Sequence, residues 1–417
     1  SEEPFFPKNT VISNLKFRAS WGQLGNENAL GKYDFLARIA SYNDMYMGYV
    51  QGAGSNPWTG SIARALENRS LKWETTDTKN IGFDFSLFGN HLNGNINYYI
   101  NETRDLLITR RIAPSAGLDN PTLNVGKMRN QGFELELNWN DKISDFEYNV
   151  GFNISTIANK VVALANEDQT IYGVGLKYGT EHFPTQTKVG KPIGAFYLYQ
   201  ADGIFQSLEE VQAHKNSKGE LLQPNAQPGD VRFKDMNGDG VIDEDDKTYS
   251  GTGIAKVEAN LNLGASYKGF DFSAVIGSAF GNKLYNGIRY YYEGMNSGSN
   301  FLKTTLNAWT PTNTKTDIPR AVFGDPNQNT RESTRFLENG DFVRLRQVQV
   351  GYTLPKALSK HIYCESIRFY VSAENVFTIT GYSGANPEFS QGVLNSGVDR
   401  FTYPFSRSYT VGAQVSF

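Results

Sequence analysis

The residues best suited to chemistry lie in one acidic stretch, DMNGDGVIDEDD, at residues 235–246. Its spacing matches the calcium loop of an EF-hand, in which oxygens at positions 1, 3, 5, 7, 9 and 12 surround one ion and a glycine at position 6 makes the turn. Those ligand positions are held by Asp235, Asn237, Asp239, the backbone carbonyl of Val241, Asp243 (through water) and Asp246. Oxygen-only ligands favour calcium, because zinc prefers nitrogen or sulfur. We therefore predict a structural calcium ion in this loop.

A second interpretation of this stretch stays open. Position twelve is Asp246, whose side chain is shorter than the usual glutamate and less suited to bidentate binding. No helical repeat flanks the loop, so it would be a single calcium loop and not a sensor pair. The alternative is a solvated acidic loop closed by Asx turns, in which Asp and Asn side chains bind nearby backbone groups.

The rest of the chain offers no catalytic constellation. The four histidines are scattered, at His91, His182, His214 and His361. Only His361 has a ligand-like neighbour, Cys364, and the short turn that holds both contains no further Cys or His, so we predict a structural role for the pair. No phosphate-binding loop or G-x-S-x-G nucleophile motif is present. Glu134 and Glu136 share one face of a predicted strand, which is more typical of a wet lumen than of an acid–base pair. We predict that the protein is not an enzyme.

The composition of the chain excludes several classes of protein. A net charge of −3 argues against nucleic-acid binding, which needs a basic surface. One cysteine excludes an internal disulfide framework. No apolar run approaches the roughly 18 residues of a membrane helix, and the first ten residues lack the pattern of a signal peptide. A membrane β-barrel remains possible, because its lipid-facing residues alternate with polar ones.

Ten segments alternate apolar and polar residues with the period of a β-strand. They are residues 14–21, 80–88, 92–100, 132–139, 146–155, 257–267, 270–280, 341–352, 367–375 and 408–417. The last segment, SYTVGAQVSF, runs to the terminal Phe417. In the segment 341–352 the apolar parity switches between Leu345 and Val348, which predicts a β-bulge near Arg346 and Gln347.

The connections between these segments alternate strictly between short and long. Five are long, roughly residues 23–72, 102–123, 160–254, 283–339 and 378–404. Short turns at one rim and long loops at the other are the pattern of an outer-membrane barrel. Aromatic residues gather beside the short turns, as an interfacial girdle requires: Phe88, Trp139, Tyr148, Tyr267, Phe270, Tyr352 and Phe417. A secreted β-sandwich also alternates, but its loops need not sort by length between two ends.

Several stretches resemble the SusC-like TonB-dependent transporters of Bacteroidetes outer membranes. They are LKFRASWGQLGN, SLKWETTDTKNIGFDFSLF, LNVGKMRNQGFELELNW, VGKPIGAFYLYQADGIF, PGDVRFKDMNGDGVIDEDD, NGDFVRLRQVQVGYTLP, SAENVFTITGYSGANPE and the terminal Phe417. The resemblance implies an all-β fold in which residues 1–417 supply the C-terminal ten strands of a 22-stranded antiparallel transmembrane barrel. The plug, the TonB box and the first strands would be absent from this chain, and residues 160–254 would form a long extracellular loop with the calcium motif.

The family resemblance also implies function and partners. The protein would import oligosaccharides or peptides across the outer membrane, under a SusD-like lipoprotein lid and with energy from TonB through the plug. Its other partners would be the N-terminal part of the same transporter and outer-membrane lipid. Two alternatives remain: a siderophore or vitamin receptor of the TonB-dependent type, and a calcium-dependent adhesin or carbohydrate-binding module. The sequence assigns no substrate-binding residue.

Two of the long loops are rich in aromatic side chains that could stack on sugar rings, cover a partner protein or pack between loops. One loop carries Tyr42, Tyr46, Tyr49 and Trp58, and the other Tyr290, Tyr291, Tyr292, Phe301 and Trp309. Packing between loops is the interpretation that we favour for any single one.

Overall fold

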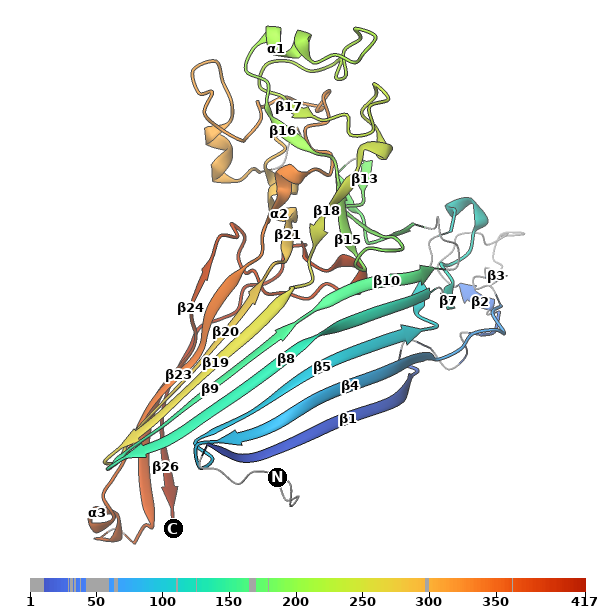
Figure 1. The fold of residues 1–417 in the computed structure, drawn as a ribbon. Helices are drawn as coiled ribbons and strands as arrows, with labels where there is room; N and C mark the ends of the chain where they lie inside the picture. Colours follow the sequence, from blue (N-terminus) through green and yellow to red (C-terminus); the bar gives the residue numbers. More distant parts are fainter. Residues whose placement is uncertain are drawn as a thin grey trace, which may run out of the picture.

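The computed structural model describes the chain except residues 1–10, 29, 31–32, 34, 38, 43–59, 64–66, 110–111, 125, 165–169, 179, 297–299 and 362. Its main element is one curved antiparallel sheet of long tilted strands, here called the wall (Figure 1). In spatial order the wall consists of β1 (Ile12–Asn26), β4 (Glu74–Leu87), β5 (Leu92–Arg104), β8 (Gly126–Ile143), β9 (Phe146–Thr156), β19 (Val257–Tyr267), β20 (Phe270–Phe280), β23 (Phe342–Thr353), β24 (Ser366–Thr380) and β26 (Ser408–Ser416). An eleventh strand, β10 (Ala158–Leu164), pairs with the upper part of β8.

These ten strands are the ten that the alternating pattern predicts, in chain order. Each strand between β1 and β26 pairs with the wall strand before it and the wall strand after it, as in an up-and-down barrel. Within the described residues the sheet does not close on itself, because β1 pairs only with β4 and β26 only with β24. The prediction of an all-β, antiparallel barrel wall that is open in this chain is confirmed.

The wall has one apolar and one polar face. Opposite one another on the apolar face lie Phe17 and Phe83, whose ring centroids are 5.2 Å apart. On the polar face of the same pair of strands, Arg18 and Asp84 form an ion pair at 2.7 Å. The two faces therefore face different solvents, lipid outside and water inside.

The predicted bulge lies in β23. Val275 pairs with Gln347 and Ile276 with Leu345, so Arg346 is the extra residue. The register against β24 also shifts at this level, but there the extra residue is on β24, because Asn375 and Val376 lie opposite Arg346. Since Arg346 has no partner on β20, Arg346 and Gln347 both lie on the polar face, and the apolar parity changes beyond the bulge.

Short turns join the strands at one rim, and they require left-handed backbone conformations. Lys268 and Gly269, with φ of 45° and 90°, connect β19 to β20, and α3 (Lys356–His361) lies in the longest of these turns. Aromatic rings gather beside them as predicted: the Phe270 and Tyr352 centroids are 4.5 Å apart. The C-terminus lies at this same rim (Figure 1).

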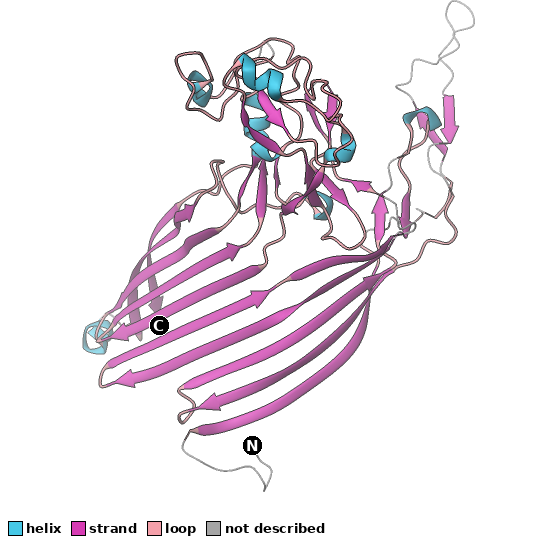
Figure 2. Ribbon diagram, turned by 45° about the horizontal axis from the view of Figure 1, so that its top comes forward, coloured by secondary structure: helices cyan, strands magenta, loops and turns pink. Residues whose placement is uncertain are grey.

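Long loops at the opposite rim build a second body, here called the cap, from residues 170–256, 281–341 and 381–407 (Figure 2). Its strands are β11 (Ile171–Tyr172), β12 (Leu176–Tyr178), β13 (Thr180–His182), β14 (Thr185–Thr187), β15 (Ala195–Leu198), β16 (Ala201–Ile204), β17 (Val231–Phe233), β18 (Thr248–Thr252), β21 (Lys283–Asn286), β22 (Leu337–Asn339) and β25 (Val398–Asp399). Its helices are α1 (Leu208–Ala213) and α2 (Gly287–Tyr292), with short 3-10 turns at Glu244–Asp246, Lys303–Asn307, Thr334–Phe336 and Val393–Asn395.

The two remaining long loops form small hairpins away from the cap (Figure 1). They contain β2 (Ile39–Tyr42) paired with β3 (Gly60–Ala63), and β6 (Leu107–Thr109) paired with β7 (Thr122–Asn124), with a 3-10 turn at Pro114–Ala116. No helix among the described residues is long and apolar enough to cross a membrane.

The cap has its own hydrophobic core. Seven residues from its three segments are almost completely buried together: Leu176, Phe196, Leu198, Tyr285, Tyr290, Phe336 and Val398. Because β21 pairs with β22 on one side and β25 on the other, the core ties the second and third loop segments into one sheet. The cap is thus a folded body and not a set of independent loops.

Candidate functional site

On the polar face of the wall, a network of charged and amide side chains runs from β1 to β8. Arg18 reaches across β4 to Asn97 on β5, with 3.0 Å from Nη2 to Oδ1. On β8, Glu136 accepts from Asn95 at 2.9 Å. The predicted placement of Glu136 on a wet face is thus reproduced, and its bonds are structural ones. Such a face suits passage of a polar solute, because it offers donors and acceptors along the whole wall.

The cap is anchored to this polar face by two arginines of β23. Arg344 and Arg346 both bind Glu388 of the loop 381–407, at 2.9 and 3.0 Å. Arg344 also donates to Asn386 at 2.5 Å and is almost fully buried. One carboxylate shared by two guanidinium groups leaves an excess positive charge where the cap meets the lumen.

A buried ion-pair centre holds two cap segments together. Glu332 lies 2.5 Å from the Lys247 ammonium and 2.8 Å from His182 Nδ1. Burial alone raises the pKa of the Glu332 carboxyl, but the His182 contact and the Lys247 charge outweigh it and hold the pKa at about 2. The His182 contact is an ion pair when the imidazole is protonated. The centre joins residues up to 150 positions apart, and no local sequence signal marked it.

The predicted calcium loop forms a compact turn in the cap. Asp235 accepts from the backbone N–H of Gly238 at 2.6 Å and of Gly240 at 2.9 Å. Gly240 has φ of 92°, and a Cβ there would come within 2.9 Å of Asn216 Nδ2. The glycine is therefore required both by the turn and by this close contact.

The closing residue of the loop, Asp246, is fully buried. Its carboxylate accepts from the backbone N–H of Met236 at 2.6 Å and of Asp243 at 2.8 Å, which draws the two ends of the loop together. Asp239 and Asn237 make Asx-type bonds to the next-but-one backbone N–H, at 2.9 Å each. In this structure the loop is closed by the Asx bonds of the alternative interpretation.

The donor set still fits calcium by its chemistry, since every side chain at a ligand position offers oxygen and the Val241 carbonyl lies beside Gly240 at the turn. Over the part of the chain that the structure describes, however, no three His, Cys, Asp or Glu side chains are grouped as a metal centre. Calcium bound by Asp235, Asn237, Asp239, Val241, Asp243 and Asp246 therefore stays a prediction.

Two aromatic residues of the long loops are buried in the cap. Tyr290 is 1% exposed in the cap core, and Trp309 is 8% exposed and donates from Nε1 to Gln206 at 3.0 Å. These two support packing between loops. Tyr46, Tyr49 and Trp58 lie outside the described residues, as does the side chain of Tyr42.

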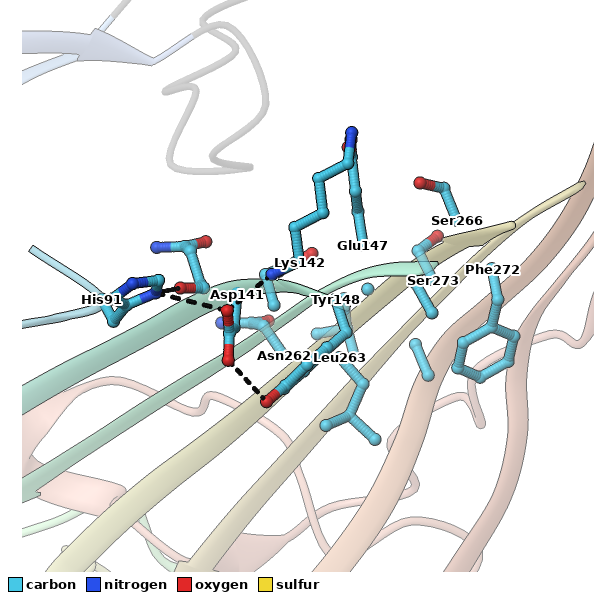
Figure 3. A pocket seen from close by; sticks show the side chains of 16 residues that line it. His91, Asp141, Lys142, Glu147, Tyr148, Asn262, Leu263, Ser266, Phe272 and Ser273 are labelled. Atoms are coloured by element: carbon cyan, nitrogen blue, oxygen red, sulfur yellow. Dashed lines mark hydrogen bonds and ion pairs between the residues drawn. The ribbon is translucent and has the colours of Figure 1, made fainter. Parts of the chain in front are cut away.

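A cavity of about 720 Å³ lies beside the short turns (Figure 3). Three of its polar side chains contact one another: the His91 ring lies 3.4 Å from Asp141, and Tyr148 donates to Asp141 at 3.4 Å. Trp139 in turn donates to Tyr148 at 3.2 Å, so the group belongs to the aromatic girdle.

His361 and Cys364, for which the sequence predicts a structural role, lie in the turn of α3. Cys364 is buried there, and His361 Nδ1 contacts the Ala357 carbonyl oxygen at 2.6 Å.

A curved antiparallel wall with an apolar outer face, an aromatic girdle at the short turns and a folded cap over the other rim defines an outer-membrane β-barrel. A family model described as "TonB dependent receptor-like, beta-barrel" matches residues 5–376, and the chain belongs to that family. The protein is accordingly located in the outer membrane. The family consists of receptors and transporters and not of enzymes.

Similar proteins agree with this family. TonB-dependent receptor P3 of Formosa agariphila is 29% identical over all of this chain, and TonB-dependent receptor SusC of Bacteroides thetaiotaomicron is 27% identical. The RagAB peptide transporter matches 99% of this chain at 25% identity with a TM-score of 0.78. The chain covers 41% of P3, 39% of SusC and 42% of the RagAB chain, so it spans about two fifths of the length of each.

Proposed function

We propose that the chain is part of a SusC-like TonB-dependent importer, which moves oligosaccharides or peptides across the outer membrane together with a SusD-like surface lipoprotein. The solute binds between lid and barrel, the plug rearranges under force from TonB, and the solute is released inward without chemical change. In this proposal the lipid-exposed wall is the transmembrane part, and the cap lies outside the cell.

One observation carries the proposal: the wall and the cap together match the RagAB peptide transporter over 99% of this chain. A match limited to the strands would support only a membrane barrel. The cap has a buried core and buried ion pairs of its own, as a fixed platform for a lid requires. Loops this large are poorly explained as bare edges of a pore.

Closure of the barrel is part of the proposal. The outer edges of β1 and β26 each present a row of backbone N–H and C=O groups that lipid cannot satisfy. We expect strands from the N-terminal part of the same transporter to pair with both edges. That part would also carry the plug and the contact with TonB.

The proposal also includes a structural calcium ion in the cap. Asp235, Asn237, Asp239, the Val241 carbonyl, Asp243 and Asp246 would hold it. The ion would supply positive charge to four carboxylates in one short loop, and so order residues 160–254 in the cap. No step of transport depends on it.

The test is a pair of measurements on the complete transporter in its own cells. Affinity purification from outer membranes should yield a lipoprotein in equal amount, and uptake of oligosaccharide or peptide nutrients should stop when tonB is deleted. A transporter that purifies alone and delivers an iron chelate or vitamin would be a receptor of the other TonB-dependent type. A chain recovered in the soluble fraction without detergent would point to an adhesin or carbohydrate-binding module.

A further inference from the structure

Beneath the cap, on the polar face of the wall, lies a cavity of about 390 Å³ that the proposed function does not assign. Residues of β19 and β20, the bulge of β23 and the loop 381–407 line it. Its charged lining residues are Glu258, Arg346 and Glu388, and its amides are Asn260 and Asn282. The volume is within the range of small-ligand sites.

The cation in the cavity lining is the guanidinium of Arg346. Arg346 shares Glu388 with Arg344, so two guanidinium groups are balanced by one carboxylate. Only one Nη2 contact of Arg346 with Glu388 is formed, at 3.0 Å, while a guanidinium has five N–H donors. The side chain is fixed in place, because the bulge turns it inward and a Cβ at Gly277 would collide with its Nε. Arg346 therefore offers positioned, unused donors to an acidic group.

Two other lining residues, Glu258 and Asn282, offer acceptors. Glu258 is exposed to the lumen and forms no ion pair with any residue that the structure describes. Asn282 is only 6% exposed, and among the described residues its Oδ1 has no hydrogen-bond donor. A buried acceptor without a donor is costly, so the amide is suited to receiving an N–H from a bound molecule.

We propose that this cavity, which we call the inner subsite, binds a zwitterionic, peptide-like part of the imported solute. A carboxylate would bind Arg346, and ammonium or amide N–H groups would bind Glu258 and Asn282. A neutral sugar leaves both charges without a counter-charge when it displaces water from them. The inference rests on the proposed function and selects peptides from its two substrate classes.

The test is isothermal titration calorimetry with the complete transporter in detergent. The probes are trialanine, the same peptide acetylated and amidated at its ends, and maltotriose. We expect trialanine to bind about tenfold or more tightly than either uncharged probe, because each charge-assisted hydrogen bond contributes to its affinity. Equal affinity for the free and the end-capped peptide, or preference for maltotriose, would overturn the proposal.

Substitutions test whether trialanine binds in the inner subsite. Glu258→Gln and Arg346→Gln should each weaken trialanine binding about tenfold, whereas Arg346→Lys should restore part of it by keeping the charge. The matched control is Glu136→Gln, which removes a carboxylate from the same polar face but not from the cavity, and it should leave affinity unchanged. If Glu258→Gln and Arg346→Gln both bind trialanine like the unaltered transporter, the inner subsite is not the binding site.

The proposed function can fail separately. If TonB-dependent uptake and the co-purified lipoprotein persist while the Glu258 and Arg346 variants keep full affinity, only the inner subsite is wrong. If no uptake depends on TonB, the importer proposal fails whatever the calorimetry shows.

Discussion

The wall and the cap are stabilised in opposite ways. In the wall, large apolar side chains point outward and are exposed in the isolated chain: Trp21 is 67% and Val411 82% exposed. In the cap, Tyr285 and Phe336 are completely buried. The wall therefore depends on lipid for the burial of its apolar face, whereas the cap folds around its own core as a water-soluble domain does.

The charges show the same contrast. In the wall, Arg18 and Asp84 are 38% and 34% exposed, so water screens their attraction. In the cap, Lys247 and Glu332 are 2% and 5% exposed, and removal of either leaves the other as an uncompensated buried charge. Point substitutions should therefore damage the cap more than the wall, while shifts of register should damage the wall more than the cap.

The largest effect is expected from a one-residue deletion in β23. Deletion of Gln349 would move the neighbouring Val350 and Tyr352 to the other face of the sheet, so we expect assembled protein in the outer membrane to fall roughly tenfold or more. Deletion of Arg346 is the comparison, because it removes the extra residue and leaves β23 paired continuously with β20, so that the irregularity is confined to the β24 side. The amounts of folded, heat-modifiable barrel that the two deletion variants give on gels are compared. Equal loss from both deletions would contradict the assigned register.

The next effect concerns the cap core. Phe336→Ala removes a ring that packs 5.9 Å from Tyr285 and 5.6 Å from Tyr290 between centroids. We expect a loss of about 3–5 kcal/mol of local stability, read as faster hydrogen exchange over residues 281–341 with the wall unchanged. Phe83→Ala, on the lipid-facing side of the wall, is the comparison and should leave exchange in the cap as it is. Uniform exchange changes in wall and cap would mean that they are one cooperative unit.

The buried carboxylate predicts a pH dependence for the cap alone. Because the pKa of Glu332 in the folded protein is about 2, below the ordinary glutamate value of 4.5, its ionised form stabilises the cap fully above pH about 4.5. This contribution, about 3 kcal/mol for a shift of that size, is lost as the pH falls from about 4.5 toward about 2. Hydrogen exchange in the cap over this range measures it. Glu332→Gln should remove this acid-dependent step, and its persistence in that variant would assign it to other groups.

The smallest effect is expected in the predicted calcium loop. Asp239→Ala removes the acceptor of the Val241 N–H and one predicted ligand, so about 1 kcal/mol of local stability should be lost without calcium. The unaltered loop should gain protection from exchange when millimolar calcium is added, and the variant should gain less. Magnesium is the control ion, because its stricter octahedral geometry suits this loop poorly. No difference between calcium and chelator would leave the loop as an Asx-closed turn.

The wall could be predicted from the sequence because its determinants are local. Alternation assigns the faces, turn length gives the connectivity, and the parity switch at Leu345 and Val348 marks the bulge. The cap could not be predicted in this way. Its core joins Leu176 to Val398, and its ion-pair centre joins His182 to Glu332, so the partners are distant in sequence and leave no periodic signal. The calcium motif was visible because all its positions lie in twelve residues, but a local pattern does not say whether the ion is bound.

The orientation of the two regions tests the central claim most directly. In a background with Cys364→Ser, a single cysteine is introduced either by Leu306→Cys in the cap or by Tyr363→Cys in the turn of α3, where the native side chains are 85% and 94% exposed. Intact cells of a strain without the lid lipoprotein are treated with a maleimide that cannot cross the outer membrane. The account predicts labelling of the Leu306→Cys protein in intact cells and of the Tyr363→Cys protein only after the outer membrane is permeabilised. Labelling of the Tyr363→Cys protein in intact cells, with the Leu306→Cys protein protected, would contradict it.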